Sequence, residues 1–463
     1  MRFDRTFSDA EALMWRLEKD PYLSSTFGAV MVLDRAPDWP ALQRRMAYAA
    51  ASVERLHQRV HPAVGGLPPV WGDDPQFDLN YHVRRIACPK PATLRAAIDL
   101  ATVLMADPLD RTRPLWQYVV IEGIRGGKAI VLQKMHHTLT DGERGVELSL
   151  HYLDFERDAP DPAITRRAPD DVAGDEPSGP VAGEHSAADT VREFVGGSLR
   201  LPLGVARQVG QLLADPGSIP DATGAAARTL RTMVTQLSDT AGAQSPLWTE
   251  RSLRRRLEPL QASFQATKGA AKALGGTLNT AFLTAAAQAA GAYHAELGQP
   301  VESLRASMAI STRTEQSGSN AFSLARLVVP AGEMTITERF HIVEQQIAAA
   351  REASGGAGLD VLAALTSGLP TSLLTRLARQ QAETVDFATS NLRGSPVPMF
   401  LAGAQIEAVY ALGPLLGVAF NLTLMSYLGS LDMGLHVDTA AVAEPELLAR
   451  CFRLAFSELH KAA

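Results

Sequence analysis

Residues 134–142 read Lys134-Met135-His136-His137-Thr138-Leu139-Thr140-Asp141-Gly142. The segment 129–132 before them is apolar and rich in β-branched side chains, which predicts a buried strand. After them, apolar residues recur at helical spacing over 143–153. Asp141 stands where a helix N-cap residue would stand, and Gly142 permits a tight turn. The sequence therefore predicts a strand that ends in two histidines, followed by an Asp-Gly turn and a helix.

The two adjacent histidines are expected to differ in role. Side chains alternate between the faces of a strand, so His136 and His137 should point in opposite directions, one toward a cavity and one toward packed protein. A histidine with a pKa of about 6.5 is a suitable general base at neutral pH. The alternatives are two hydrogen-bonded core histidines or a metal site. The alternation of faces argues against both rings binding one ion.

The whole pattern His-His-x-x-x-Asp-Gly resembles the signature of the CoA-dependent acyltransferase superfamily. This group includes chloramphenicol acetyltransferase, the condensation domains of nonribosomal peptide synthetases, and the bacterial wax ester synthases/acyl-CoA:diacylglycerol acyltransferases. The resemblance implies that His137 is the general base, that His136 is structural, and that Asp141 and Gly142 keep the histidine loop in place. It also implies an α/β fold of two chloramphenicol-acetyltransferase-like lobes, with mixed sheets flanked by helices and an active-site channel between the lobes.

Further motifs resemble the wax ester synthase/diacylglycerol acyltransferase family in the same order along the chain. Pro114-Leu115-Trp116 precedes a predicted strand, Asn279 begins an Ala-rich buried helix, and Ser390-Asn391 is followed by Gly394. A buried amide needs hydrogen-bond partners, so Asn279 is a candidate for orienting the site or stabilising an oxyanion. The sequence departs from the family pattern at Thr280, Ala309, Ser319 and Ser395.

The composition predicts a globular protein of two or three domains. The chain has 463 residues, of which 46% are hydrophobic and 20% charged, and its net charge is −6. This charge indicates no nucleic-acid partner and no global attraction to an anionic membrane. Cys88 and Cys451 form no metal motif and fit a reducing cytoplasm. The charged start at Arg2 and Asp4 predicts no secretion signal.

We expect four segments along the chain: an N-terminal lobe at 1–158 with the histidine motif, a Pro- and acid-rich linker at 159–189, a helical connecting segment at 190–245, and a C-terminal lobe at 246–463. Ser8 and Glu11 form an N-cap signal for a first helix. The uncharged stretch 408–431 is long enough to cross a bilayer. Because Gly413-Pro414 and other glycines interrupt it, we predict two buried strands around a Gly-Pro loop.

Four arginines lie near the start of the predicted C-terminal lobe, and two interpretations of them remain open. They form either a solvated helix face or a contact for the phosphates of CoA. These residues are Arg251, Arg254, Arg255 and Arg256.

The resemblance implies an O-acyltransferase that moves a long-chain acyl group from acyl-CoA, a co-substrate, to diacylglycerol or a long-chain alcohol. It implies no cofactor and no metal, and it implies a cytoplasmic protein in peripheral contact with membranes or lipid droplets. A nucleophile elbow, a phosphate-binding loop and a dinucleotide fingerprint are absent from the sequence. Two alternatives are a condensation-type acyltransferase that uses carrier-protein thioesters and a non-catalytic lipid-binding protein of the same fold.

Overall fold

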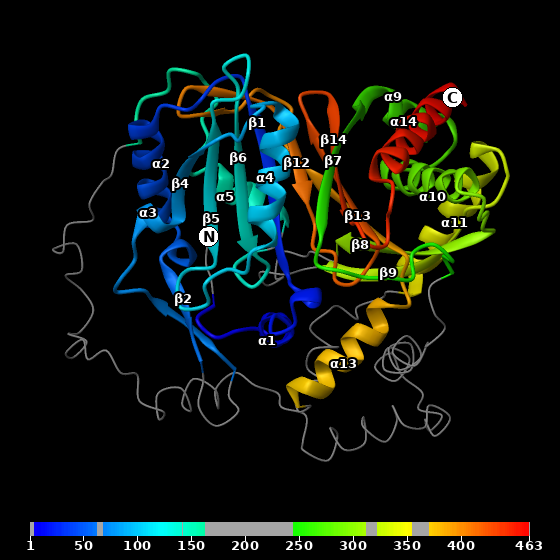
Figure 1. Ribbon diagram of the computed structural model, residues 1–463, viewed down its shortest axis with the longest axis horizontal. Coiled ribbons are helices and arrows are strands. Elements are labelled where there is room, and N and C mark those ends of the chain that lie inside the picture. The colour runs from blue at the N-terminus through cyan, green and yellow to red at the C-terminus, as the bar shows by residue number, and fades with distance from the viewer. Residues whose placement is uncertain are drawn as a thin grey trace.

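The computed structural model describes residues 4–62, 68–140, 142–162, 244–311, 322–353 and 370–462. These residues form two six-stranded sheets that lie side by side, with helices packed on them (Figure 1). Each sheet contains both parallel and antiparallel strand pairs. The predicted α/β fold with two mixed sheets is therefore confirmed. Asp141, Ser319 and nearly all of the predicted linker and connecting segment lie outside the described residues.

The first sheet carries the histidine motif near its centre. Its strands lie in the order β11 (Phe400–Leu401), β12 (Ala404–Leu412), β1 (Thr26–Leu33), β6 (Ala129–His136), β5 (Trp116–Glu122) and β4 (Val83–Ala87). Helix α4 (Leu94–Ala106) packs on one face, in a core with Val30 and Leu132. Helix α2 (Trp39–Ser52) packs on the other face, in a core with Met31 and Val131. Both faces of the sheet are thus covered.

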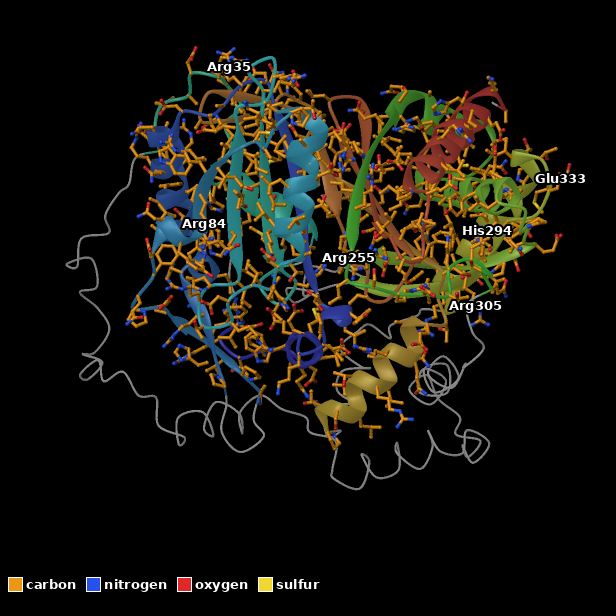
Figure 2. All side chains as sticks on the ribbon, in the orientation of Figure 1. Arg35, Arg84, Arg255, His294, Arg305 and Glu333 are labelled. Carbon is orange, nitrogen blue, oxygen red and sulfur yellow. The ribbon has the colours of Figure 1, made fainter. Side chains whose placement is uncertain are left out.

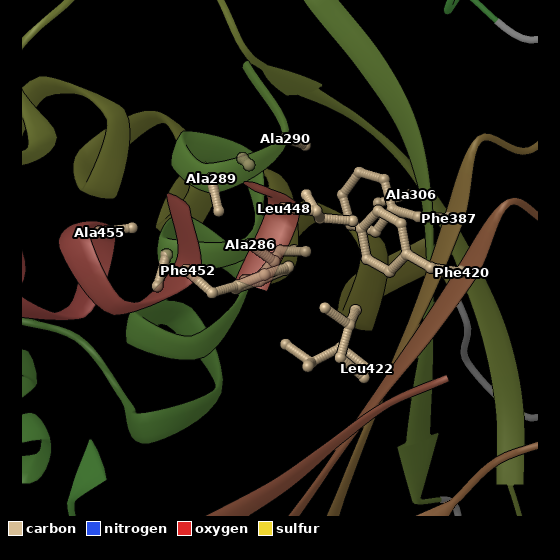
Figure 3. Packing of buried hydrophobic residues seen from close by; sticks show 14 of the residues in the cluster. Ala286, Ala289, Ala290, Ala306, Phe387, Phe420, Leu422, Leu448, Phe452 and Ala455 are labelled. Atoms are coloured by element: carbon tan, nitrogen blue, oxygen red, sulfur yellow. The ribbon is translucent and has the colours of Figure 1, made fainter. Parts of the chain in front are cut away.

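The second sheet has the order β7 (Arg255–Ser263), β14 (Ser430–Asp438), β13 (Phe420–Tyr427), β10 (Phe387–Arg393), β8 (Ser303–Ser311) and β9 (Phe322–Pro330). One face packs against helices α10 (Leu278–Glu296), α11 (Ile336–Ala353) and α14 (Pro445–Lys461). Helix α10 is buried along most of its length, as its alanines predicted, because small side chains let neighbouring elements approach closely. Figure 3 shows part of this core, including Ala286, Ala289, Leu448, Phe452, Phe387 and Phe420.

Smaller elements complete the fold. Strands β2 (Gln58–His61) and β3 (Val70–Asp73) form a two-stranded sheet. The remaining helices are α1 (Asp9–Leu17), α3 (Leu79–His82), α5 (Gly142–Ser149), α9 (Phe264–Ala273) and α13 (Thr371–Ala382), with 3₁₀ turns at Pro21–Leu23 and Glu54–Leu56. Helix α1 begins with the predicted capping box, in which Ser8 accepts from the Glu11 N–H and Glu11 accepts from the Ser8 N–H. This cap fixes where α1 starts.

The uncharged stretch at 408–431 forms strands, as predicted. It contains the end of β12, the Gly413-Pro414 loop and the whole of β13. Of the helices in the described ranges, none has the length and apolar character that crossing a membrane requires. The side chains of this stretch are mostly buried between the two sheets and within the second core.

The division of the chain between the lobes differs from the expected boundaries. The expectation assigned all of 246–463 to the C-terminal lobe, but β11 and β12 belong to the first sheet. Strand β12 pairs antiparallel with β1, from Gly28 opposite Leu412 to Leu33 opposite Ile406. In Figure 1, β12 accordingly lies beside β1, among strands from the first third of the chain. Strand β1 is thus paired with β6 on one side and with β12 on the other.

Candidate active site

The histidine motif lies at the end of β6, between β1 and β5. His136 is the last strand residue and stands opposite Thr26 of β1. Its backbone N–H donates to the carbonyl of Leu115 at 3.1 Å, and the N–H of His137 donates to the carbonyl of Ser25 at 3.1 Å. Backbone hydrogen bonds from two directions therefore fix both histidines where the ladder ends.

His136 is enclosed in packed protein. Its side chain is buried, with Nε2 2.9 Å from Oε2 of Glu18 and Nδ1 2.8 Å from Oγ1 of Thr138. The backbone N–H of Thr138 donates to Nδ1 at 3.1 Å. Because Nδ1 accepts, the proton of a neutral ring lies on Nε2 and is donated to Glu18. Every polar atom of the ring thus has a protein partner.

Glu18 is the anchor of this arrangement. It follows α1 as the C-cap residue and also accepts from the hydroxyl of Ser24 and the N–H of Ser25, each at 2.7 Å. Burial on its own would raise the pKa of Glu18, but the hydrogen bonds from His136, Ser24 and Ser25 together lower it. The carboxylate is therefore ionised at neutral pH, and it holds the segment that pairs with His137.

His137 has different neighbours from His136, as the alternation of faces predicted. It is half-buried, and its ring lies 4.4 Å from that of Phe27 with the ring planes tilted by 36°. Atom Nδ1 is buried. Phe27, on β1, therefore limits the orientations that the His137 ring can take.

The side chain of Lys134 links β6 to the C-terminal end of α4 by hydrogen bonds. Its side chain is buried, and Nζ donates to the carbonyls of Leu104, at 2.9 Å, and Asp107. Burial lowers the pKa of Lys134 to about 8. Since these carbonyls lie at the C-terminal end of α4, the ammonium group satisfies acceptors that the helix leaves unpaired.

The Pro-Leu-Trp segment lies in the core beside the histidine motif. Leu115 supplies the carbonyl that accepts from His136. Trp116 is fully buried, donates its indole N–H to the carbonyl of Leu56 at 2.8 Å and stacks on His82 at 4.5 Å. The segment therefore supports the end of β6 from the β5 side.

Asn279 lies at the start of α10 and contacts the Ser-Asn segment. The side-chain amide of Asn391 donates to Oδ1 of Asn279 at 2.6 Å. Asn391 stands opposite Leu424, which belongs to the core under α10. Its neighbour Leu392 faces the other way and packs on Gly142, the first residue of α5. The two asparagines thus link α10 to β10, the strand that contacts the histidine loop.

Thr280, a departure from the family pattern, completes a capping box with Thr277. The hydroxyl of each threonine accepts the backbone N–H of the other, and the Thr280 hydroxyl also donates to the carboxylate of Glu344. A hydroxyl at this position satisfies the first turn of α10.

Comparison with known proteins assigns the chain to a family. The profile described as the wax ester synthase/diacylglycerol acyltransferase catalytic domain matches residues 7–282, and that of the family's C-terminal domain matches 318–460. The chain belongs to this family. A putative diacylglycerol O-acyltransferase of Mycobacterium tuberculosis is 32% identical over 99% of this chain and 92% of its own length. A probable diacylglycerol O-acyltransferase of the same species is 26% identical over 93% and 90%.

Solved structures share the fold of this wax ester synthase/diacylglycerol acyltransferase family member. The wax ester synthase/diacylglycerol acyltransferase of Marinobacter aquaeolei has a TM-score of 0.66 at 19% identity, covering 98% of each chain. The first condensation domain of the CDA synthetase has a TM-score of 0.58 at 14% identity, covering 99% of this chain and 97% of that one. The expected superfamily fold is confirmed.

The arginine cluster at the start of the second sheet of this family member is largely used internally. Arg251 donates to the carbonyl of Gly417 at 2.6 Å, and Arg255, labelled in Figure 2, pairs with Asp438 at 3.1 Å. Arg256 pairs with Glu258 at 2.5 Å. Because Arg255 and Arg256 open β7, the first of the two interpretations, a solvated helix face, is wrong.

Sequence reasoning missed Glu18 and Leu392 in this family member. Glu18 lies 118 residues before His136, and the only local signal was its position at the end of a capped helix. Leu392 follows Asn391 within the Ser-Asn segment, but nothing in that segment shows that it reaches Gly142. Both contacts depend on which elements the fold brings together.

Proposed function

We propose that the protein transfers a long-chain acyl group from acyl-CoA to the hydroxyl of diacylglycerol. The observation that carries this proposal is the family membership over nearly the whole chain, together with the half-buried His137 at the end of β6. The diacylglycerol O-acyltransferase names of the relatives support this acceptor. The Marinobacter enzyme supports a long-chain alcohol as a second acceptor.

In this mechanism His137 acts as a general base. Because Nδ1 is buried, Nε2 is the ring nitrogen that accepts the proton of the acceptor hydroxyl. The hydroxyl oxygen attacks the thioester carbonyl, the carbon–sulfur bond breaks, and the imidazolium returns the proton to the CoA thiolate. A thioester is already an activated acyl donor, so no covalent acyl-enzyme is required.

The surroundings of His137 suit this role. Phe27 restricts the ring orientation, and the Ser25 carbonyl holds the backbone. His136 keeps Glu18, and through it Ser25, in place, which is a positioning role. We further propose that the chain works in peripheral contact with a membrane or lipid droplet, because both acceptors partition into such phases.

A competition assay tests the proposal. Purified protein receives palmitoyl-CoA with equal amounts of diacylglycerol and hexadecanol, and products are resolved by mass spectrometry. We expect triacylglycerol as the main ester and a loss of about 10² to 10⁴ in turnover for His137→Ala. His341→Ala, which changes an exposed histidine of α11, is the matched control and should keep full turnover.

The other outcomes discriminate the alternatives. Near-normal turnover of a folded His137→Ala protein would contradict the general-base role. Ester formation only with a phosphopantetheinyl carrier would favour a condensation-type acyltransferase that uses carrier-protein thioesters. The similarity in fold to condensation domains is consistent with this alternative. Lipid binding without product from any donor would indicate a non-catalytic protein.

A further inference from the structure

Gly142, the first residue of α5, lies against the side chain of Leu392 from the second sheet. A Cβ atom built on Gly142 would lie 2.7 Å from Cδ2 of Leu392, 3.4 Å from Cδ1 and 3.6 Å from Cγ. The first distance is shorter than carbon atoms tolerate without displacement. An alanine at 142 would therefore require Leu392 to change its rotamer or the start of α5 to move.

Gly142 is the first residue of α5, next to the histidine loop. The side chain of Leu392 occupies the space into which a side chain at position 142 would project. Packing against Leu392 therefore limits the room at this position.

Leu392 lies on a strand whose own position is fixed by neighbouring elements. Asn391, the residue before it, is held by Asn279 of α10 at 2.6 Å. Leu392 itself stands opposite Met425 in the parallel pair of β10 and β13. The side chain thus projects from a strand that is fixed by pairing and by the asparagine contact, toward the helix that follows the histidine loop.

We propose that Leu392 is a positioning residue, which holds the His137 loop from the second sheet by packing on Gly142. The effect on turnover rests on the proposed function, whereas the packing itself does not. In this arrangement the glycine of the histidine motif is the residue against which Leu392 of the second sheet packs. This contact joins the second sheet to the helix that follows the His137 loop.

The test is a double-mutant cycle with Gly142→Ala, Leu392→Ala and both changes together. Overpacking predicts that Gly142→Ala lowers kcat by about tenfold or more, with little change in KM for acyl-CoA. Leu392→Ala removes the obstacle, so the double variant should recover most of the kcat that Gly142→Ala loses. The thermal midpoints of the four proteins, which need no substrate, should show the same recovery.

Gly145→Ala is the matched control within the same helix. A Cβ at Gly145 would meet Phe27 and Thr140 only at 3.7–3.8 Å, which is ordinary contact. This variant should keep wild-type kcat and thermal midpoint. If it behaved like Gly142→Ala, a general intolerance of α5 to alanine would explain both, and the proposal would fail.

Two further outcomes overturn the proposal. Additive losses in the double variant, in both kcat and thermal midpoint, would show that Leu392 and Gly142 do not constrain each other. Wild-type properties for Gly142→Ala would show that the contact has room to relax. If wild-type protein made no ester from any donor but the thermal midpoints still showed recovery, the proposed function would fail while the packing contact stood.

Discussion

Oε2 of Glu18 lies 2.9 Å from Nε2 of His136, and the same carboxylate oxygen accepts the N–H of Ser25. The carbonyl of Ser25 in turn accepts the N–H of His137. One buried side chain, located before β1, is therefore connected to both histidines of the motif. Any change at Glu18 should reach the proposed base through the backbone of Ser25.

We predict that Glu18→Gln lowers the free energy of unfolding by about 1–3 kcal/mol, because the ionised acceptor of a buried network is lost. Turnover should fall by about tenfold to a hundredfold as the His137 backbone shifts. Chemical denaturation and initial rates measure the two effects. Asp20→Asn is the control, since Asp20 pairs with the partly exposed Arg379 at 2.7 Å and the contacts of the described residues do not join it to either histidine. Equal losses in both variants would contradict the prediction.

The Asn279–Asn391 pair gives a second prediction. Since Asn391 stands beside core residues and holds β10 to α10, Asn279→Ala and Asn391→Ala should lower turnover to a similar extent. A double-mutant cycle on unfolding should give a coupling of about 1 kcal/mol, the value of one hydrogen bond. If Asn279 instead stabilises an oxyanion directly, Asn279→Ala alone should cost about 10² to 10³ in kcat.

Two buried histidines predict acid sensitivity. Burial lowers the pKa of His82 and of His436 to about 4 from an ordinary value of 6.5. Between these values the unfolded chain binds protons that the folded chain does not, so each histidine contributes stability above pH 6.5 that is lost as pH falls toward 4.

The corresponding variant is His436→Asn, whose amide can still donate to the Gly413 carbonyl, 3.0 Å from Nδ1 of His436. The fall in unfolding free energy between pH 6.5 and 4 should shrink by up to about 3 kcal/mol relative to wild type. Urea denaturation at a series of pH values measures it. An unchanged slope would contradict the assignment.

Trp116→Phe should lower the free energy of unfolding by about 1–2 kcal/mol, because the buried carbonyl of Leu56 loses its donor. Trp248→Phe is a matched control: this tryptophan is equally buried, and its indole N–H has no hydrogen-bond partner among the described residues. Trp248→Phe should lower the free energy of unfolding by less than Trp116→Phe does. The reverse order in calorimetry would contradict the hydrogen-bond argument.

Local patterns were sufficient for several elements. The Ser8–Glu11 cap, the strand ending at His136 and the buried α10 were all predicted because each depends on residues that are close in sequence. The strands around Gly413-Pro414 were likewise predictable from the interruption of an uncharged stretch. In each of these cases the backbone conformation follows from neighbours within a few turns.

The contacts that build the site could not be predicted in this way. Glu18 meets His136, and Asn279 meets Asn391, only because the order of strands in the two sheets brings distant segments together. Periodicity shows which face of an element is buried but not which element covers it. The same reason explains why the arginines of the Arg251–Arg256 cluster were not recognised as internal partners of Asp438 and Glu258.

The insertion of β12 beside β1 has a consequence for the order of synthesis. Strand β1 is buried along nearly its whole length, yet one edge stays unpaired until residues 404–412 have left the ribosome. Such an apolar edge is a template for pairing with other chains. The sheet that carries the histidine motif can therefore be completed only after β12 has been synthesised, and a fragment truncated before β12 should aggregate rather than fold.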